Sequence, residues 1–238
     1  KYESVRIRAS IAELAANGGA PMGFYTRVKD PEARKVITSY YGFLHQYDDL
    51  YHDNTSHAEA LLIFPRSAVH AGELAPRDRF KQLGRKLLDE HVLFDILPDD
   101  MATPAVRKKY GLVVDPNDTK VSTASLQKAL PAGRSRFAAP ATVRVSASRP
   151  ALLDELTVHF VNYNRTERGE GGNPGGTIKD EKPIATKEFG AKIQVPEGFT
   201  VKRVEFLTPE VGKPASLKHG LSNGQLSIRI PSFSVYGV

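Results

Sequence analysis

Hydrophobic residues recur at two different spacings along this chain, and the spacing changes near residue 140. Before that point, apolar residues return every three or four positions in several segments, which predicts amphipathic helices. These segments are residues 5–16, 31–47, 76–91 and 123–130. In the first of them the spacing places Leu14 on the inward face, and Ser122 is the predicted cap of the last. Short apolar runs predict strands at residues 60–64, 93–97 and 110–114. Strands separated by helices pair in parallel, because a parallel neighbour needs a crossover, so this half predicts a small open sheet.

After residue 140, apolar and polar residues alternate with a period of two, which predicts strands with one buried face. The alternating segments are residues 142–148, 156–163, 188–195, 201–207 and 225–230. Turn residues separate them, and Asn223-Gly224 is a strong hairpin signal. The predicted fold class is therefore α/β plus all-β, with an abbreviated flavodoxin-like parallel sheet layer followed by an antiparallel β-sandwich.

The change of pattern also predicts how the chain divides into domains. The segment before the parallel sheet holds two predicted helices with a buried strand, PMGFY (21–25), between them. That order is typical of the closing part of an α/β barrel, and equally of other α/β fragments. Residues 131–140 are rich in small residues and prolines and are predicted to be a linker. The predicted domains are the barrel part at 1–59, the parallel layer at 60–135 and the sandwich at 136–238.

Composition and charge narrow the classes of function. The apolar fraction of 40% and the charged fraction of 25% are those of a soluble globular protein. The apolar runs are too short to cross a bilayer, so no membrane partner is predicted. The net charge of +6 is spread thinly, whereas nucleic-acid binders concentrate their cations, so no nucleic-acid partner is predicted either. A first residue that is not Met, and an end that resembles mid-strand, indicate a processed or partial chain.

The absence of cysteine removes disulfides, thiolate nucleophiles and Cys-based zinc sites. The densest polar cluster is HQYDDLYHDNTSHAE at 45–59, where nitrogen and carboxylate groups at such spacing could hold a divalent metal. His52 and His57 are five apart, however, and that spacing does not place two side chains on one helix face. We favour a polar connection between two domains, and we predict neither a metal nor a cofactor.

His159 lies in the alternating stretch LTVHFVNYNR and raises the question of a catalytic site. Leu156, Val158 and Phe160 share one face of the predicted strand. Thr157, His159 and Val161 share the other face. A single histidine on the outward face of a sandwich strand is more often solvated, or paired across strands, than catalytic. We therefore predict that His159 is not a catalyst.

Two carboxylates follow the predicted strand at 21–25. Asp30 and Glu32, with Arg27, would lie past its carboxyl end, where barrel enzymes place their chemistry. Asp30 followed by Pro31 is also a good start signal for the next helix, and we favour that role. The glycine-rich run at 168–176 satisfies no phosphate-loop pattern and is predicted to be a loop.

Several segments together resemble a known family. ALLIFPRSAVHAG, followed by RDRFKQLGRKLLDEHVLFDILPDD, is similar to the domain after the catalytic barrel in bacterial β-galactosidase-type glycoside hydrolases. That domain looks like a glutamine amidotransferase layer without its cysteine, and it often mediates trimer formation. IAELAANGGAPMGFY resembles the last helix and strand of such a barrel. LTVHFVNYNR, VEFLTPE and IPSFSVYGV resemble the closing β-sandwich.

The resemblance implies an accessory C-terminal portion of a carbohydrate-active hydrolase, with retaining hydrolysis by two carboxylates. Those carboxylates would lie before Lys1, so no catalytic residue is carried over to this sequence. Tyr25 and Arg27 are the expected substrate-binding residues of the cleft. The expected partners are a carbohydrate and either further copies of the chain, as a homo-oligomer, or the rest of its own barrel. The layer departs from the family because the usual later strands are not evident after YGLVV.

Two alternatives stay open at this point. A non-enzymatic carbohydrate-binding or interaction protein would use exposed aromatic side chains of the sandwich, for which Tyr163, Phe233 and Tyr236 are available. The absence of tryptophan weakens that hypothesis. A metal-dependent enzyme would use the cluster at 45–59.

Overall fold

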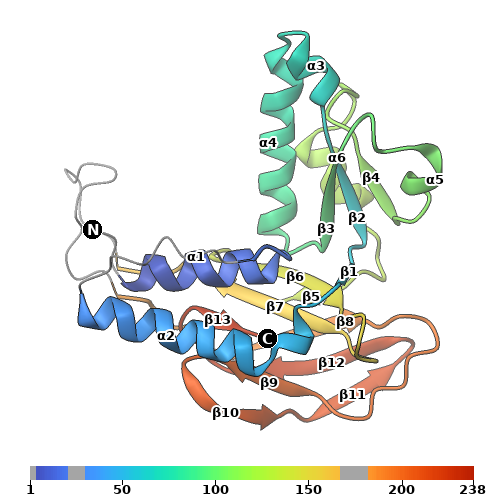
Figure 1. Cartoon of the computed structure of the whole chain (residues 1–238). Helices are drawn as coiled ribbons and strands as arrows, with labels where there is room; N and C mark the ends of the chain where they lie inside the picture. Colours follow the sequence, from blue (N-terminus) through green and yellow to red (C-terminus); the bar gives the residue numbers. More distant parts are fainter. Residues whose placement is uncertain (1–3, 21–29, 167–181) are drawn as a thin grey trace.

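The computed structural model describes residues 4–20, 30–166 and 182–238 of the chain. Figure 1 shows three parts: a pair of helices, a small parallel layer that stands above the rest, and an antiparallel sandwich below it. The predicted combination of a parallel layer with an antiparallel sandwich is confirmed. The strand predicted at 21–25 lies outside the described residues.

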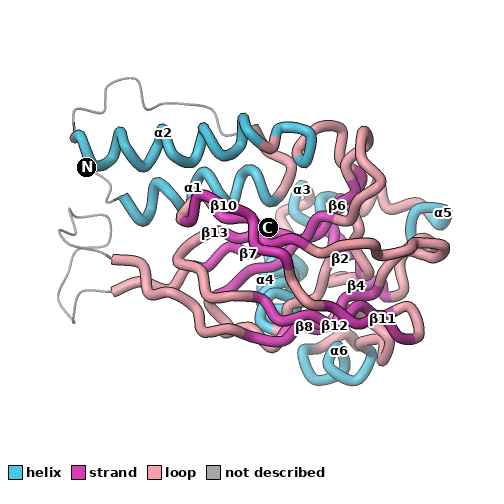
Figure 2. Tube along the Cα trace, turned by 90° about the horizontal axis from the view of Figure 1, so that it is seen from below, coloured by secondary structure: helices cyan, strands magenta, loops and turns pink. Residues whose placement is uncertain are grey.

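The helix pair consists of α1 (Ser4–Ala16) and α2 (Pro31–Gln46), which lie side by side in both Figure 1 and Figure 2. Asp30 is the N-cap of α2, and its carboxylate accepts a hydrogen bond from the Glu32 amide at 3.1 Å, as the helix start signal predicts. Leu14, which the spacing places on the inward face of α1, is instead 42% exposed because only one side of the helix meets the sandwich. A short 3₁₀ helix (Asp48–Leu50) follows α2.

The parallel layer is a three-stranded sheet with helices packed against one face and the residues Ala102 and Tyr110 against the other. Its strand order is β3-β2-β4, with β2 (Ala60–Phe64) in the centre between β3 (Phe94–Pro98) and β4 (Leu112–Val114). Apolar side chains of α4 (Leu74–Asp89) and α6 (Thr123–Ala129) cover one face. Ser122 caps α6 in a capping box, as predicted. Two short helices complete the layer, α3 (Arg66–His70) and α5 (Pro104–Arg107).

The sandwich consists of two antiparallel four-stranded sheets and one hairpin. The first sheet has the order β1-β6-β7-β13 and the second the order β11-β12-β8-β5. The strands of the first sheet are β1 (Thr55–Ser56), β6 (Val143–Arg149), β7 (Thr157–Asn162) and β13 (Tyr236–Gly237). Those of the second are β11 (His219–Ser222), β12 (Gln225–Ile230), β8 (Phe189–Gln194) and β5 (Arg136–Phe137). The hairpin is β9 (Glu205–Thr208) with β10 (Val211–Ser216).

The segment predicted as a linker is partly a strand, which corrects the sequence interpretation. Within residues 131–140, β5 pairs with β8 and places Arg136 directly opposite Lys192. Two residues are too few to show an alternating pattern, so the sequence gives no strand signal there. The predicted Asn223-Gly224 hairpin is confirmed: both residues have positive φ, 52° and 72°, and they join β11 to β12.

The alternation of β7 is confirmed, but its outward face is not in water. Phe160 points into the core between the two sheets, where it contacts Phe189 and Phe233. Val161, on the other face, packs with the helix pair instead. Helices α1 and α2 therefore form a third layer over the first sheet, and the predicted exposed face of β7 is covered.

Candidate functional site

Of the residues that the sequence singles out, Tyr25 and Arg27 lie outside the described part of the chain, as does the glycine-rich run at 168–176. Their roles as expected substrate-binding residues and as a loop therefore stay predictions. The other candidates can be placed.

His159 is buried between the first sheet and the helix pair, with 1% of its surface exposed. Its Nδ1 lies 2.8 Å from the hydroxyl of Tyr236, which in turn lies 3.0 Å from the hydroxyl of Tyr51. Burial lowers the pKa of His159 to about 4, so the imidazole is neutral at ordinary pH. The neutral ring joins two tyrosines from distant parts of the chain, which is a structural role.

The polar cluster at 45–59 is divided among separate partners. His52 pairs with Asp48 at 3.2 Å on the surface, whereas Nε2 of His57 lies 2.9 Å from the Gln194 carbonyl oxygen. Glu59 binds Ser135. In the ranges that the structure describes, no three His, Asp or Glu side chains gather in a group that could hold a metal ion.

Glu59 and Ser135 connect the parallel layer to the sandwich. The Glu59 carboxylate accepts hydrogen bonds from the Ser135 amide at 2.9 and 3.0 Å and from its hydroxyl at 2.6 Å. The same Ser135 hydroxyl accepts a hydrogen bond from the backbone amide of Gln194 at 2.9 Å. Since Ser135 is fully buried, these bonds satisfy polar groups that would otherwise be costly. The carboxyl end of the polar cluster at 45–59 therefore forms a polar contact rather than a metal site, and the predicted division into domains stays a prediction.

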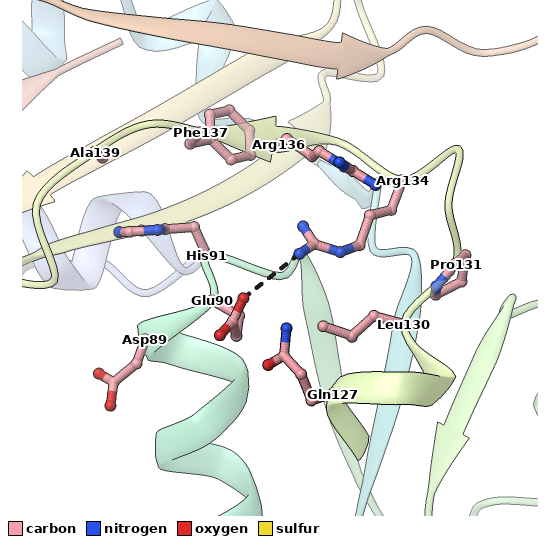
Figure 3. Close-up of a pocket in the computed structure, with 10 residues that line it drawn as sticks. All are labelled: Asp89, Glu90, His91, Gln127, Leu130, Pro131, Arg134, Arg136, Phe137 and Ala139. Carbon is pink, nitrogen blue, oxygen red and sulfur yellow. Dashed lines mark ion pairs between the residues drawn. The ribbon is translucent and has the colours of Figure 1, made fainter. Parts of the chain in front are cut away.

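A polar pocket of about 480 Å³ lies at the same connection, and we call it the junction pocket (Figure 3). Its walls are the carboxyl end of α4, the carboxyl end of α6 and the segment that leads into β5. Figure 3 shows the Arg134 side chain pointing across the pocket toward Glu90, with Gln127 beside them. The lining residues are Asp89, Glu90, His91, Gln127, Leu130, Pro131, Arg134, Arg136, Phe137 and Ala139.

Charged groups in the junction pocket are partly paired. The Glu90 carboxylate accepts a hydrogen bond from the Lys86 ammonium at 2.7 Å and lies 3.7 Å from the Arg134 guanidinium. The hydrogen bond from Lys86 lowers the pKa of Glu90. Asp89 lies 3.3 Å from Arg144. Burial lowers the pKa of Arg134, and the like charge of Arg136 acts in the same direction.

His91 lies at the left of the pocket in Figure 3, above Asp89, and follows the carboxyl end of α4 in the left-handed conformation, with φ of 50°. Its amide donates to the Leu88 carbonyl, and its Nε2 lies 3.1 Å from the Pro140 carbonyl oxygen. Burial lowers the pKa of His91, which favours a neutral ring. The ring therefore offers hydrogen bonding without charge.

No pattern in the sequence predicts the junction pocket. Glu90-His91 and Arg134 lie more than forty positions apart, in segments interpreted as a helix end and a linker. Charged residues at a helix end are common, and no spacing rule pairs them with a distant linker. The only available signal is RSR at 134–136, two cations within a segment otherwise made of small residues.

Comparisons with known proteins show that this chain shares its fold with parts of solved structures. Neither protein-family profiles nor curated proteins match this sequence significantly. Among solved structures, the chain resembles parts of carbohydrate-active enzymes. α-L-Fucosidase isoenzyme 2 from Paenibacillus thiaminolyticus is 11% identical, with a TM-score of 0.67 over 99% of this chain and 56% of that chain. Cycloisomaltooligosaccharide glucanotransferase from Paenibacillus sp., in complex with cycloisomaltoheptaose, is 13% identical, with a TM-score of 0.51 over 99% and 27%.

The chain thus spans about half the length of the fucosidase and about a quarter of the glucanotransferase. At such low identity the likeness is one of fold. Within the described ranges, no helix has the length and apolar character needed to cross a membrane.

Proposed function

We propose that this chain is an accessory, non-catalytic portion of a carbohydrate-active glycoside hydrolase. The observation that carries the proposal is the fold likeness to an α-L-fucosidase over 99% of this chain. The second solved structure is named for a reaction on glucose oligomers, which supports the same broad class. A fold alone hosts many functions, so the proposal also needs support from the residues themselves.

The carboxylates of the junction pocket support a non-catalytic role. A glycoside hydrolase needs one carboxyl group with a raised pKa, which acts as the general acid. Glu90 has the opposite property, because Lys86 lowers its pKa, and Asp89 is neighboured by Arg144. In this proposal the catalytic carboxylates belong to a segment that precedes Lys1.

The finer parts of the sequence interpretation belong to the same proposal. They are a β-galactosidase-type parent enzyme, helices α1 and α2 as the end of its barrel, a flavodoxin-like character of the parallel layer, and a role in forming an oligomer. The division at residues 59 and 135 is part of it as well. Ile96 in edge strand β3 and Met101 shortly after it are exposed apolar side chains. Another part of a larger assembly would cover them if it packed against this edge of the sheet.

An assay with a panel of aryl glycosides tests the proposal. We expect residues 1–238 alone to release no nitrophenol from α-L-fucosides, β-galactosides or α-glucosides, and the full gene product to hydrolyse one of them. In the full gene product, Asp89→Asn and Glu90→Gln should leave kcat unchanged. Turnover by residues 1–238 alone, or loss of kcat in either variant, would contradict the proposal.

The non-enzymatic alternative loses its original support. It depends on exposed aromatic side chains, but Phe233 and Tyr236 are buried and Tyr163 is half-buried. Phe233 contributes to the sandwich core and Tyr236 to the contact with the helix pair. The planar aromatic platform expected for glycan binding is therefore absent at these three positions, and the junction pocket is the remaining candidate for binding.

A further inference from the structure

We propose that the junction pocket binds a sugar unit that carries a carboxylate, as uronic acids do. The carbohydrate part of this inference rests on the proposed function, whereas the carboxylate part rests on the charges around the pocket. The volume of about 480 Å³ is within the usual range for sites that enclose small ligands. The walls come from the parallel layer on one side and from the segment leading into β5 on the other.

Unbalanced positive charge marks one side of the pocket. Arg136 lies directly opposite Lys192 on paired antiparallel strands, so the two side chains leave the sheet on the same face. Like charges at directly opposite positions destabilise a sheet. Among the described residues, no carboxylate lies within ion-pair distance of either cation. An anion at Arg136 would relieve this repulsion.

Arg134 adds a second guanidinium, which reaches across the pocket toward Glu90 (Figure 3). Its only carboxylate contact among the described residues is Glu90 at 3.7 Å, a long distance, while one guanidinium nitrogen donates to the Ser135 carbonyl at 2.8 Å. The nearby charge of Arg136 lowers the pKa of Arg134, as burial does, so the two cations lie close enough to repel each other. Two guanidinium groups that line one pocket are suited to a carboxylate, which each can bind through paired hydrogen bonds.

The opposite side of the pocket offers groups that suit hydroxyls. Glu90 and Gln127 lie next to each other in Figure 3, and Asp89 and His91 flank them. Carboxylate oxygens accept hydrogen bonds, and the amide of Gln127 both donates and accepts, which matches vicinal hydroxyl groups. Leu130 and Pro131 supply a small apolar surface against which the C–H face of a sugar ring can pack.

The arginines and the hydroxyl-binding groups of the pocket together exclude two simpler kinds of ligand, a free inorganic anion and a neutral sugar. A free inorganic anion would leave the acceptors Glu90 and Asp89 facing its negative charge. A neutral sugar would leave uncompensated the repulsion that Arg136 experiences from Arg134 and from Lys192. A hydroxylated ring with one carboxylate satisfies both sides at once.

Calorimetric titration of the full chain tests the inference. D-Glucuronate and D-galacturonate are the probes, D-glucose and D-galactose the neutral counterparts, and inorganic phosphate and glucose 6-phosphate the other anions. We expect one of the two uronates to bind more tightly than its neutral counterpart and than inorganic phosphate. If glucose 6-phosphate binds as tightly as the uronates, the arginine side of the pocket recognises a phosphate group, and the carboxylate assignment is overturned.

Arg136→Gln is the decisive variant. Its side chain is exposed, and removing one of two opposed like charges is not expected to harm folding. Loss of a charge-assisted hydrogen bond should weaken uronate binding about tenfold and leave neutral sugars unaffected. Lys213→Gln, which removes an exposed cation from β10, is the matched control and should change nothing.

Three further results would overturn the inference: neither uronate binds more tightly than its neutral counterpart, neither binds more tightly than inorganic phosphate, or uronate binding is unchanged in Arg136→Gln. Binding is measured without any turnover, so these results leave the hydrolase proposal standing. Failure of the aryl glycoside assay, in turn, leaves a measured uronate affinity intact.

Discussion

The sandwich contacts the rest of the chain through two junctions of opposite character. At the helix junction, the first sheet meets α1 and α2 through buried apolar residues, including Ile11, Val36 and Phe43. At the layer junction, Leu93 of the layer packs into the sandwich core, but polar contacts gather around it: Glu59 with Ser135, Arg144 with Asp89, and the junction pocket. The first resembles the interior of a domain and the second resembles an interface between domains.

This difference indicates how each part contributes to the molecule. Even the polar groups at the helix junction are enclosed, since the Tyr40 hydroxyl donates to Glu210 at 2.5 Å and His159 meets Tyr236. The helix pair and the sandwich should therefore unfold together. The layer junction retains water-accessible charge and a pocket, and a ligand site is more readily accommodated there.

The largest expected effect is at the helix junction, where Phe43→Ala removes a ring that contacts Tyr47 and Tyr236, with centroids 4.9 and 6.1 Å away. We expect a loss of about 3–5 kcal/mol in the free energy of unfolding, because truncating a buried phenylalanine leaves a cavity. Urea unfolding followed by circular dichroism measures it. His45→Ala, at an exposed position of the same helix, is the control. A loss below about 1 kcal/mol would mean that the helix junction is not core-like.

His159 should make the helix junction sensitive to acid. Its pKa of about 4 in the folded chain lies below the 6.5 of a free histidine, so the unfolded chain binds the extra proton first. Its contribution to stability is therefore complete above pH 6.5 and is lost as pH falls toward 4, by roughly 3 kcal/mol.

The measurement is the difference in unfolding free energy between pH 7 and pH 4.5 for the natural chain and for His159→Gln. The variant should be less stable at pH 7 but should lose less on acidification. Buried His91, whose pKa is also lowered, contributes in the same direction in both proteins and cancels in this comparison. Equal pH slopes for the two proteins would show that His159 is not the responsible group.

At the layer junction, Glu59→Ala should cost about 2 kcal/mol, since it leaves the buried Ser135 amide and hydroxyl without their carboxylate acceptor. Hydrogen exchange at the Ser135 and Gln194 amides should quicken, while exchange in α2 should not change. Glu73→Ala, an exposed carboxylate of the same layer, is the control. Faster exchange throughout α2 would show that the two junctions are one cooperative unit.

The smallest effect is expected from Arg144→Gln, which breaks the ion pair with Asp89 at 3.3 Å. Both side chains are partly exposed, so we expect less than about 1 kcal/mol, and less still at high salt. Thermal unfolding at low and high sodium chloride measures the change. A loss that does not depend on salt would indicate that the hydrogen bonds of Arg144 to the Leu88 and Ala141 carbonyls matter more than its charge.

The sequence predicts elements whose own residues carry the signal. The helix start at Asp30, the cap at Ser122 and the hairpin at Asn223-Gly224 are local features, and the structure confirms all three. The alternation of β7 is likewise local and confirmed. What covers its outer face is a property of distant residues in α1 and α2, so the sequence does not predict that His159, which lies on that face, is buried.

Short or irregular strands were missed for the same kind of reason. β5 has two residues, and β10 and β11 are exposed throughout, so none has a buried face that repeats. The junction pocket combines a helix end with such a strand. Its residues come together only through the pairing of β5 with β8, which no local pattern specifies.

The pairing of β5 with β8 has a mechanical consequence. Arg136 moves with the sandwich because β5 is hydrogen-bonded into its second sheet, whereas Glu90 moves with α4 and the parallel layer. A tilt of one body against the other therefore widens or narrows the space between these two side chains. A molecule that binds both Arg136 and Glu90 therefore favours one relative orientation of the sandwich and the parallel layer. By thermodynamic reciprocity, any contact that holds the two bodies in that orientation raises the affinity for the molecule.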